Sequence, residues 1–330
     1  MNSSSSKTTL TDISRHQTGA FHKDVLTGLQ SNPKYLESKY FYDTTGDQLF
    51  KELMNCTEYY LTDCELEIFS KKTAELSAAV TDDDNSFDLI ELGAGDALKS
   101  TYLLNYLLEQ KVDFNYLPID ISSNVISNLT SNLPETLPNL QIMGLNGEYF
   151  EMLNKATASS SRRKAVLFLG SNIGNMPISA VLEFCKELRK HLSAGDKVLM
   201  GMDLKKNPKT ILAAYNDKGG ITKKFNLNLL ERINRELHAD FDINQFDHYA
   251  MYDPETGSCK SYLISLVDQV VHINERAYIN FLKDEHIYME ISQKFTLSQI
   301  EQIARDTGFK PLRHFFDSKE WFVDTIWQAS

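Results

Sequence analysis

The chain of 330 residues lacks features that would assign it to several large classes of protein. No stretch approaches the roughly 20 consecutive apolar residues that a membrane-spanning helix needs. The segment from Met1 to Thr9 is rich in serine and has no apolar core, so we expect residues 1–9 to form a disordered N-terminus and not a signal peptide. These absences favour a cytoplasmic protein without a membrane segment.

Cysteine, histidine and basic residues are also sparse or poorly placed for particular chemistries. The four cysteines (Cys56, Cys64, Cys185 and Cys259) show no CxxC spacing, so we expect reduced thiols and no zinc site. The eight histidines show no HxH or HExxH spacing, and we therefore expect no metal site. Lys and Arg number 34 against 45 Asp and Glu, and the net charge of −11 disfavours nucleic acid or an anionic membrane as a partner.

Residues 87–120 carry the most informative pattern that is present. An apolar strand over 87–92 runs into Gly93-Ala94-Gly95, a helical stretch follows over 98–109, and a second apolar strand ends in Asp120. Strand, glycine turn, helix, strand and acid form the nucleotide-binding half of a doubly wound sheet. Gly93 and Gly95 allow a tight turn and close approach to a ligand, and an acid in the position of Asp120 can accept hydrogen bonds from both hydroxyls of a ribose.

The glycine turn alone leaves three interpretations open. A dinucleotide fingerprint needs a third glycine, and that position holds Leu98. A first strand that ends in Glu-Leu-Gly is more typical of enzymes that use S-adenosylmethionine (SAM). A dinucleotide enzyme and a purely structural glycine turn remain alternatives at this point.

The α/β pattern around this turn predicts a discontinuous organisation of two domains. Beyond the elements above, we expect helices over 70–80, 122–132, 178–192, 210–215, 224–237 and 297–307, and strands over 139–145, 165–169, 197–203, 249–253, 260–267, 270–273, 310–317 and 320–327. Residues 25–69 are expected to be mixed helix and loop, and 281–295 extended. We assign 70–205 plus 295–330 to a Rossmann-like α/β core and 10–69 plus 206–294 to an α+β substrate-binding domain. Ligands should bind at the carboxyl ends of the core strands.

Three further clusters carry side chains that suit a small amino substrate. The first contains the tyrosines of 40–42 and 59–60 with Phe50, which form either an aromatic core or a wall that attracts a cation. The second is the turn from Gly170 to Asn175 after an apolar strand, which is either an ordinary turn or a site whose Asn175 donates and accepts hydrogen bonds. The third is Glu290 with Ser292, which face one side of an extended segment and can bind both nitrogens of an imidazole, unless they form an exposed polar edge.

Taken together, these motifs resemble one family. They are Tyr40-Phe41-Tyr42-Asp43, Glu58-Tyr59-Tyr60, Leu92-Gly93-Ala94-Gly95, Phe168-Leu169-Gly170-Ser171, Ile173-Gly174-Asn175, Ala213-Ala214-Tyr215, Phe225-Asn226, Ile233-Asn234-Arg235-Glu236-Leu237, Tyr252-Asp253-Pro254 and 290–295. In this order, from about residue 25 onward, the chain is similar to the SAM-dependent histidine Nα-methyltransferases of ergothioneine biosynthesis. The resemblance implies a class I Rossmann-like methyltransferase core and SAM as cofactor, with S-adenosylhomocysteine (SAH) as its product.

The resemblance also implies roles for individual residues. SAM would contact Gly93, Gly95, Lys99, Gly170, Asp120 at the ribose, and Glu148 with Tyr149 at the adenine. Tyr59, Asn175 and Tyr215 would hold the amine and carboxylate of L-histidine, with Tyr59 and Asn175 orienting the reacting amine. Glu290 and Ser292 would bind the imidazole, and Tyr42 and Phe50 would help to wall the site.

The implied reaction is methylation of the α-amine of L-histidine up to the trimethylated betaine hercynine, by an enzyme that we expect to be a monomer. Asn172 stands where the bacterial enzymes usually have Thr, Glu148 where they have Asp, and Ser261 aligns loosely with an expected Met, which leaves fine selectivity open. Open alternatives are another amino acid or a partly methylated histidine as substrate, a non-catalytic binding regulator, and an RNA or protein methyltransferase.

Overall fold

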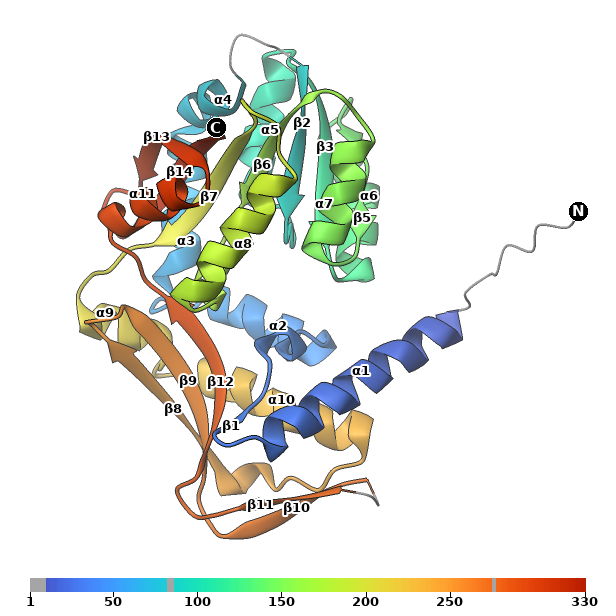
Figure 1. Ribbon diagram of the computed structural model, residues 1–330, viewed down its shortest axis with the longest axis vertical. Coiled ribbons are helices and arrows are strands. Elements are labelled where there is room, and N and C mark those ends of the chain that lie inside the picture. The colour runs from blue at the N-terminus through green and yellow to red at the C-terminus, as the bar shows by residue number, and fades with distance from the viewer. Residues whose placement is uncertain (1–9, 82–85, 275–276) are drawn as a thin grey trace, which may run out of the picture. The chain divides into compact units, whose positions relative to one another are not determined.

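The computed structural model describes residues 10–81, 86–274 and 277–330 (Figure 1). The predicted disorder of residues 1–9 lies outside the described residues. Every described helix is too short or too polar to span a bilayer.

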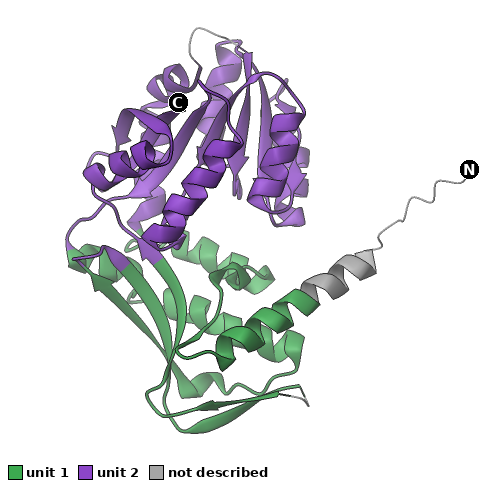
Figure 2. Cartoon of the chain, viewed as in Figure 1, with its two compact units in different colours: residues 1–59, 208–253, 259–291 green, residues 60–207, 254–258, 292–330 purple. Residues whose placement is uncertain are grey.

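The chain divides into two compact units, each built from three separate segments (Figure 2). Unit 1 comprises 1–59, 208–253 and 259–291, and unit 2 comprises 60–207, 254–258 and 292–330. Unit 2 thus starts at Tyr60 and not at the expected residue 70, because α3 (Tyr60–Lys71) sends polar side chains to unit 2. Tyr60 donates a hydrogen bond to Asp203 at 2.8 Å, and Glu65 accepts one from the backbone N–H of Gly170 at 2.9 Å.

Unit 2 is built on an eight-stranded sheet in the order β13-β14-β7-β6-β2-β3-β4, with β5 also paired to β3. The strands are β2 (Ser86–Leu92), β3 (Asp113–Asp120), β4 (Gln141–Ile142), β5 (Leu145–Asn146), β6 (Arg163–Phe168), β7 (Lys197–Asp203), β13 (Phe309–Phe316) and β14 (Phe322–Ala329). The pairs among β2 to β7 are parallel, whereas β14 is antiparallel to both β7 and β13. This is the expected doubly wound α/β core.

Helices cover the sheet of unit 2, so that its central strands are buried on both faces, as parallel strands usually are. One apolar cluster joins the sheet to α7 (Tyr149–Ala158), α8 (Ile178–Lys190) and α11 (Leu297–Asp306). The remaining helices are α3, α4 (Thr73–Thr81), α5 (Ser100–Glu109), α6 (Ser123–Thr136) and the 3₁₀ turn η2 (Asn172–Asn175). The helix α11 begins at Thr296, whose side chain forms a reciprocal capping box with Gln299.

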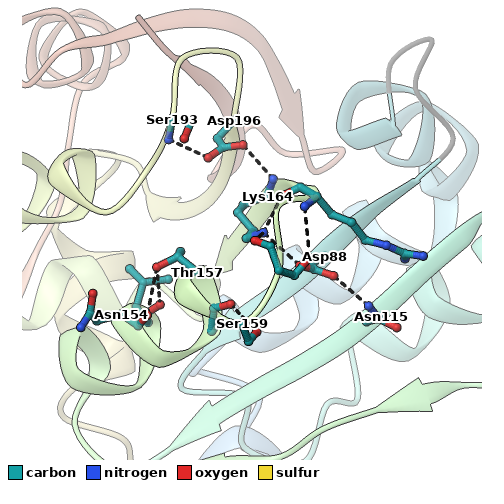
Figure 3. Close-up of polar contacts among 12 residues, drawn as sticks. Asp88, Asn115, Asn154, Thr157, Ser159, Lys164, Ser193 and Asp196 are labelled. Atoms are coloured by element: carbon teal, nitrogen blue, oxygen red, sulfur yellow. Dashed lines mark hydrogen bonds and ion pairs between the residues drawn. The ribbon is translucent and has the colours of Figure 1, made fainter.

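A polar network ties β2 and β6 together near their amino ends (Figure 3). Asp88 accepts hydrogen bonds from the Lys164 ammonium at 3.0 Å and from Asn115 at 2.9 Å. Asp196 accepts from the backbone N–H groups of Lys164 and Ser193, both at 2.8 Å. Because each of these carboxylates is paired, this end of the sheet is fixed by a satisfied structural network.

Unit 1 packs helices against a four-stranded sheet in the order β1-β12-β9-β8, with a separate hairpin of β10 and β11. Its strands are β1 (Lys34–Tyr35), β8 (Phe246–Asp253), β9 (Ser258–Ser265), β10 (Gln269–Ile273), β11 (Ala277–Phe281) and β12 (His286–Gln293), of which β9 and β12 cross the boundary, with Ser258 and 292–293 in unit 2. Its helices are α1 (Leu10–Gln30), η1 (Ser38–Phe41), α2 (Thr44–Met54), α9 (Pro208–Ala214), α10 (Ile221–Leu237) and η3 (Ile243–Gln245). Apolar side chains from α1, α10 and the strands form its core.

Most predicted elements are confirmed within a few residues, and two predictions are wrong. The strand expected over 139–145 is two short strands, β4 and β5, which both pair with β3. The extended segment over 281–295 is broken between β11 and β12 by a turn at 282–285. Two helices had no predicted counterpart: α1, most of which precedes the mixed region expected from residue 25, and α7.

Candidate active site

The turn after β2 adopts the conformation that its glycines allow. Gly93 has a φ of +70° and Gly95 a φ of +56°, which is the left-handed region that glycine enters without a steric penalty. The backbone N–H groups of Gly93 and Ala94 both donate to the carbonyl of Ile119, at 2.8 and 3.2 Å. The predicted tight turn is confirmed, and these bonds fix it against the end of β3.

Asp120 closes β3 beside this turn. Its Oδ2 accepts a hydrogen bond from the N–H of Gly95 at 3.2 Å, and its Oδ1 accepts one from the N–H of Ser122 at 2.9 Å. Burial raises the pKa of the Asp120 carboxyl above its ordinary value, although these backbone donors act in the opposite direction. The carboxyl group is therefore held rigidly at the carboxyl end of the sheet.

Tyr149 and Asn172 lie against the glycine turn. A Cβ atom built on Gly93 would lie 2.8 Å from Tyr149 Oη and 3.2 Å from Asn172 Nδ2. Burial, followed by the charges of Asp120 and Glu148, raises the pKa of Tyr149 to about 12. The predicted residues Gly93, Asp120 and Tyr149 thus gather at one end of the sheet of unit 2, and the exposed Glu148 caps the helix α7 beside them.

Lys99 and Gly170 meet at a buried carboxylate that the sequence analysis missed. Both oxygens of Glu65 accept from the N–H of Gly170 at 2.9 Å, and Glu65 forms an ion pair with Lys99. Burial works to lower the pKa of Lys99, but the charge of Glu65 raises it above its ordinary value. Because α3 carries Glu65 into the centre of unit 2, this helix positions two of the predicted cofactor residues.

The turn after β6 also carries Asn175, the last residue of η2, which is exposed. The turn is packed closely: Ser171 has a φ of +55°, and its hydroxyl accepts from the N–H of Asp203 at 3.1 Å. A Cβ on Gly174 would lie 2.8 Å from the carbonyl oxygen of Gln293. The predicted Asn175 therefore sits on a rigid turn of unit 2.

Four predicted aromatic residues come together in unit 1. The ring centroids of Tyr42 and Phe50 lie 5.5 Å apart, those of Phe50 and Tyr59 6.4 Å, and those of Tyr59 and Tyr215 6.2 Å. Phe225 on α10 lies 5.8 Å from both Tyr42 and Phe50. We call these five residues the aromatic cluster. Most of its contacts are edge to face, the arrangement that aromatic rings prefer.

Glu290 contacts α10 at the residue that follows Phe225. Asn226 is fully buried on α10, and its Nδ2 lies 3.0 Å from the carbonyl oxygen of Thr222 and 3.5 Å from Glu290 Oε1. Burial, and then the charge of Glu290, raises the pKa of Tyr288 on the same strand to about 12. Sequence reasoning used Phe225-Asn226 only as a motif, without a role for either residue.

Ser292 belongs to unit 2, and its hydroxyl is backed by a buried ion pair. Its Oγ accepts a hydrogen bond from the Lys294 ammonium at 2.8 Å, and Lys294 lies 2.7 Å from Asp203 Oδ2. The side chains of Lys294 and Asp203 are both 0% exposed. The structure thus places Tyr42, Phe50, Tyr59, Tyr215 and Glu290 in unit 1, and Asn175, Ser292 and the cofactor residues in unit 2.

The parallel α/β sheet, the left-handed glycine turn and the acid at the end of the next strand define a class I SAM-dependent methyltransferase. The model of a family described as histidine-specific, SAM-dependent methyltransferases matches residues 21–329. The chain belongs to this family.

Curated relatives agree with the family. The chain is 31% identical over 299 residues to a histidine N-alpha-methyltransferase of Mycolicibacterium smegmatis, with 90% of this chain and 91% of the relative covered. It is 32% identical, with the same coverage, to the protein of that name from Mycobacterium tuberculosis. It is 26% identical to ergothioneine biosynthesis protein 1 of Schizosaccharomyces pombe, where 83% of this chain matches 36% of a longer protein.

Proposed function

We propose that this enzyme transfers methyl groups from SAM to the α-amine of L-histidine, in three successive steps, to give the betaine hercynine. The observation that carries the proposal lies in unit 1, where α10 carries Phe225 in the aromatic cluster and, as the next residue, Asn226, whose Nδ2 lies 3.5 Å from the carboxylate of Glu290. Rings attract a cation, and a carboxylate accepts from an imidazole N–H, so one unit offers partners for both ends of histidine.

The residues of unit 2 fit the cofactor. Tyr149 and Asn172 leave no room for a side chain at Gly93. A glycine is expected where a ligand closely approaches the backbone. Asp120 would accept from the ribose hydroxyls, and Glu148 and Tyr149 would face the adenine. The rest of the cofactor site would be lined by Gly95, Lys99 and Gly170. When bound, SAM supplies a methyl group already activated by its sulfonium.

We further propose that Tyr59, Asn175 and Tyr215 hold the amine and carboxylate of histidine, that Glu290 and Ser292 bind its ring, and that Tyr42 and Phe50 wall the site. The reacting amine must be neutral and held about 3–3.5 Å from the methyl carbon. Its pKa of roughly 8–9 makes deprotonation easy, so the proposal needs no strong base. Cation–π attraction would tolerate the quaternary product.

The test is mass spectrometry of the purified protein incubated with SAM and, separately, L-histidine, L-tryptophan, L-tyrosine and mono- and dimethylhistidine. A gain of three methyl groups on histidine is the expected result. Transfer that stops at one or two methyl groups would overturn the trimethylation, and transfer only to another amine would overturn the roles of Glu290 and Ser292. Binding of SAM without any transfer would favour a regulator.

We also propose that the enzyme is a cytoplasmic monomer and that its product feeds ergothioneine biosynthesis. All four cysteines are thiols outside any disulfide, and burial raises the pKa of Cys64 and Cys185 to about 12, which suits inert reduced thiols. Light scattering from the purified protein should give the chain mass of 37.6 kDa.

A further inference from the structure

Lys294 is the most deeply buried basic residue among those described, with a side chain that is 0% exposed. A buried ammonium is costly unless it is paired and hydrogen-bonded. Here it contacts the Asp203 carboxylate at 2.7 Å and the Ser292 hydroxyl at 2.8 Å. One of its partners is thus a counter-ion, and the other is a residue proposed to bind the imidazole.

Asp203 is a counter-ion to two lysines. Lys206 forms a second ion pair with it, and the Tyr60 hydroxyl donates to it at 2.8 Å. Burial acts to raise the pKa of Asp203, but Lys294 and Lys206 together lower it below its ordinary value. The carboxylate is therefore charged at neutral pH, and Lys294 is paired as an ammonium.

An ammonium has only donors, so it fixes the direction of the hydrogen bond to Ser292. One of the two lone pairs of the Ser292 oxygen accepts this bond, and the hydroxyl proton must point away from Lys294. The nearby positive charge also polarises the hydroxyl, which makes it a stronger donor and a weaker acceptor. Glu290, two residues earlier on β12, has the opposite character, since an ionised carboxylate only accepts.

A donor and an acceptor together match one ring nitrogen with a lone pair and one with an N–H. That is the neutral imidazole; the N–H of an imidazolium would have to share the Ser292 oxygen with the positively charged Lys294 ammonium. We propose that Lys294 is a positioning residue that makes Ser292 a donor, so that the enzyme selects the neutral ring of histidine over the protonated ring. This inference rests on the proposed function.

Several titratable groups surround these residues and must be controlled for. Asp203 and Lys206 flank Lys294, Tyr60 and Cys64 approach from α3, Asp317 influences Cys64, and Tyr288 lies near Glu290. Comparing two ligands on the same enzyme cancels the contributions of these protein groups to the pH dependence of binding. 2-Fluorohistidine is suitable because fluorine lowers the pKa of the ring by several units and keeps it neutral throughout the range.

The experiment measures Kd for histidine and for 2-fluorohistidine by calorimetry, with SAH present, between pH 5.5 and 8.5. If only the neutral ring binds, the ratio of the two Kd values rises about tenfold one pH unit below the ordinary histidine pKa of about 6.5. A ratio that stays flat or falls toward low pH would overturn the inference. Methylation of histidine at pH 8 tests the proposed function separately, because it does not depend on this ratio.

Two variants separate Lys294 from a general effect of charge. Lys294→Met leaves Asp203 paired with Lys206 and Tyr60, and it should abolish the rise in the ratio because Ser292 can then accept from an imidazolium. Lys206→Met removes the other ammonium from the same carboxylate, one that donates to the Tyr60 hydroxyl and the Leu204 carbonyl, so the rise should persist. Loss of the rise in both variants would contradict the role of Lys294.

If Lys294→Met does not fold, Ser292→Ala provides the same test with the ion pair intact. It should weaken histidine binding several-fold at pH 8 and flatten the ratio. An unchanged ratio in Ser292→Ala would overturn the proposal.

Discussion

Replacing Gly93 by alanine should weaken cofactor binding far more than the same change at Gly195. Both glycines have a positive φ, +70° and +93°, so both variants force a side chain onto left-handed backbone. They differ in space, because nothing lies within 4 Å of a Cβ built on Gly195, whereas Tyr149 Oη lies 2.8 Å from one built on Gly93. Gly195→Ala is therefore a matched control for the cost of placing a side chain on left-handed backbone.

The magnitude follows from these distances. The left-handed conformation should cost each variant about 1–2 kcal/mol of unfolding free energy. Ordinary contact begins near 3.4 Å, so Tyr149 Oη must retreat by about 0.6 Å, the difference between 3.4 and 2.8 Å. The ring of Tyr149 packs against Phe168 and Phe184, at centroid distances of 5.7 and 6.5 Å, which restricts this movement. Overpacking of this kind adds about 1–3 kcal/mol to the loss of unfolding free energy in Gly93→Ala alone, and the displacement of Tyr149, proposed to face the adenine, is what should weaken SAH binding.

The assay combines urea unfolding with calorimetric titration of SAH. We expect similar losses of stability from the backbone term in both variants, and a loss of SAH affinity of about tenfold or more only in Gly93→Ala. Equal SAH affinity in the two variants would refute the argument that the space beside Gly93 is part of the cofactor site.

Three other changes have defined outcomes. Burial raises the pKa of Glu91 from 4.5 to about 7, so between these pH values the native state holds a proton that the unfolded state has lost. Urea unfolding should therefore show a free energy of unfolding that falls by up to about 3 kcal/mol as pH rises from 4.5 to 7. Glu91→Gln should remove this pH dependence, and an unchanged dependence would contradict the assignment to Glu91. Glu65→Gln removes the counter-ion of the partly exposed Lys99 and should lower the free energy of unfolding in urea by about 2–3 kcal/mol. A variant as stable as the wild type would contradict the proposal that Glu65 anchors Gly170. Glu290→Ala should raise KM for histidine at least tenfold and leave SAH affinity unchanged, because it removes a charged hydrogen bond worth about 1.5–3 kcal/mol. Equal losses of histidine and SAH binding would argue against a role of Glu290 at the ring.

The fold was largely predictable because its signals are local. Strands such as β2, β6 and β7 are short apolar runs that end in glycine or polar residues, the pattern of buried parallel strands. The strands β4 and β5 were misjudged because only two residues in each pair with β3, which is too few for a periodic pattern. The helix α1 was missed because its sequence is polar for much of its length.

The candidate site was predictable only in part. The aromatic residues and Glu290 could be recognised from motifs, but their supports could not. Glu65 lies 105 residues from Gly170 in the sequence, and nothing local marks it as the partner of that N–H. Lys294 would be expected on the surface, as lysine almost always is. Supports of this kind depend on tertiary pairing, which a sequence pattern does not reveal.

The order of strands in unit 2 has a consequence for synthesis of the chain. Asp203 at the end of β7 pairs with Phe322 at the start of β14, so 119 residues separate the two strands. At a translation rate of roughly 5–20 residues per second, β7 waits about 6–24 s for its partner. During that time its apolar edge is unpaired, and such an edge is a template for aggregation. Yield of this enzyme in a host cell should therefore depend on chaperones that shield β7 until β14 has emerged from the ribosome.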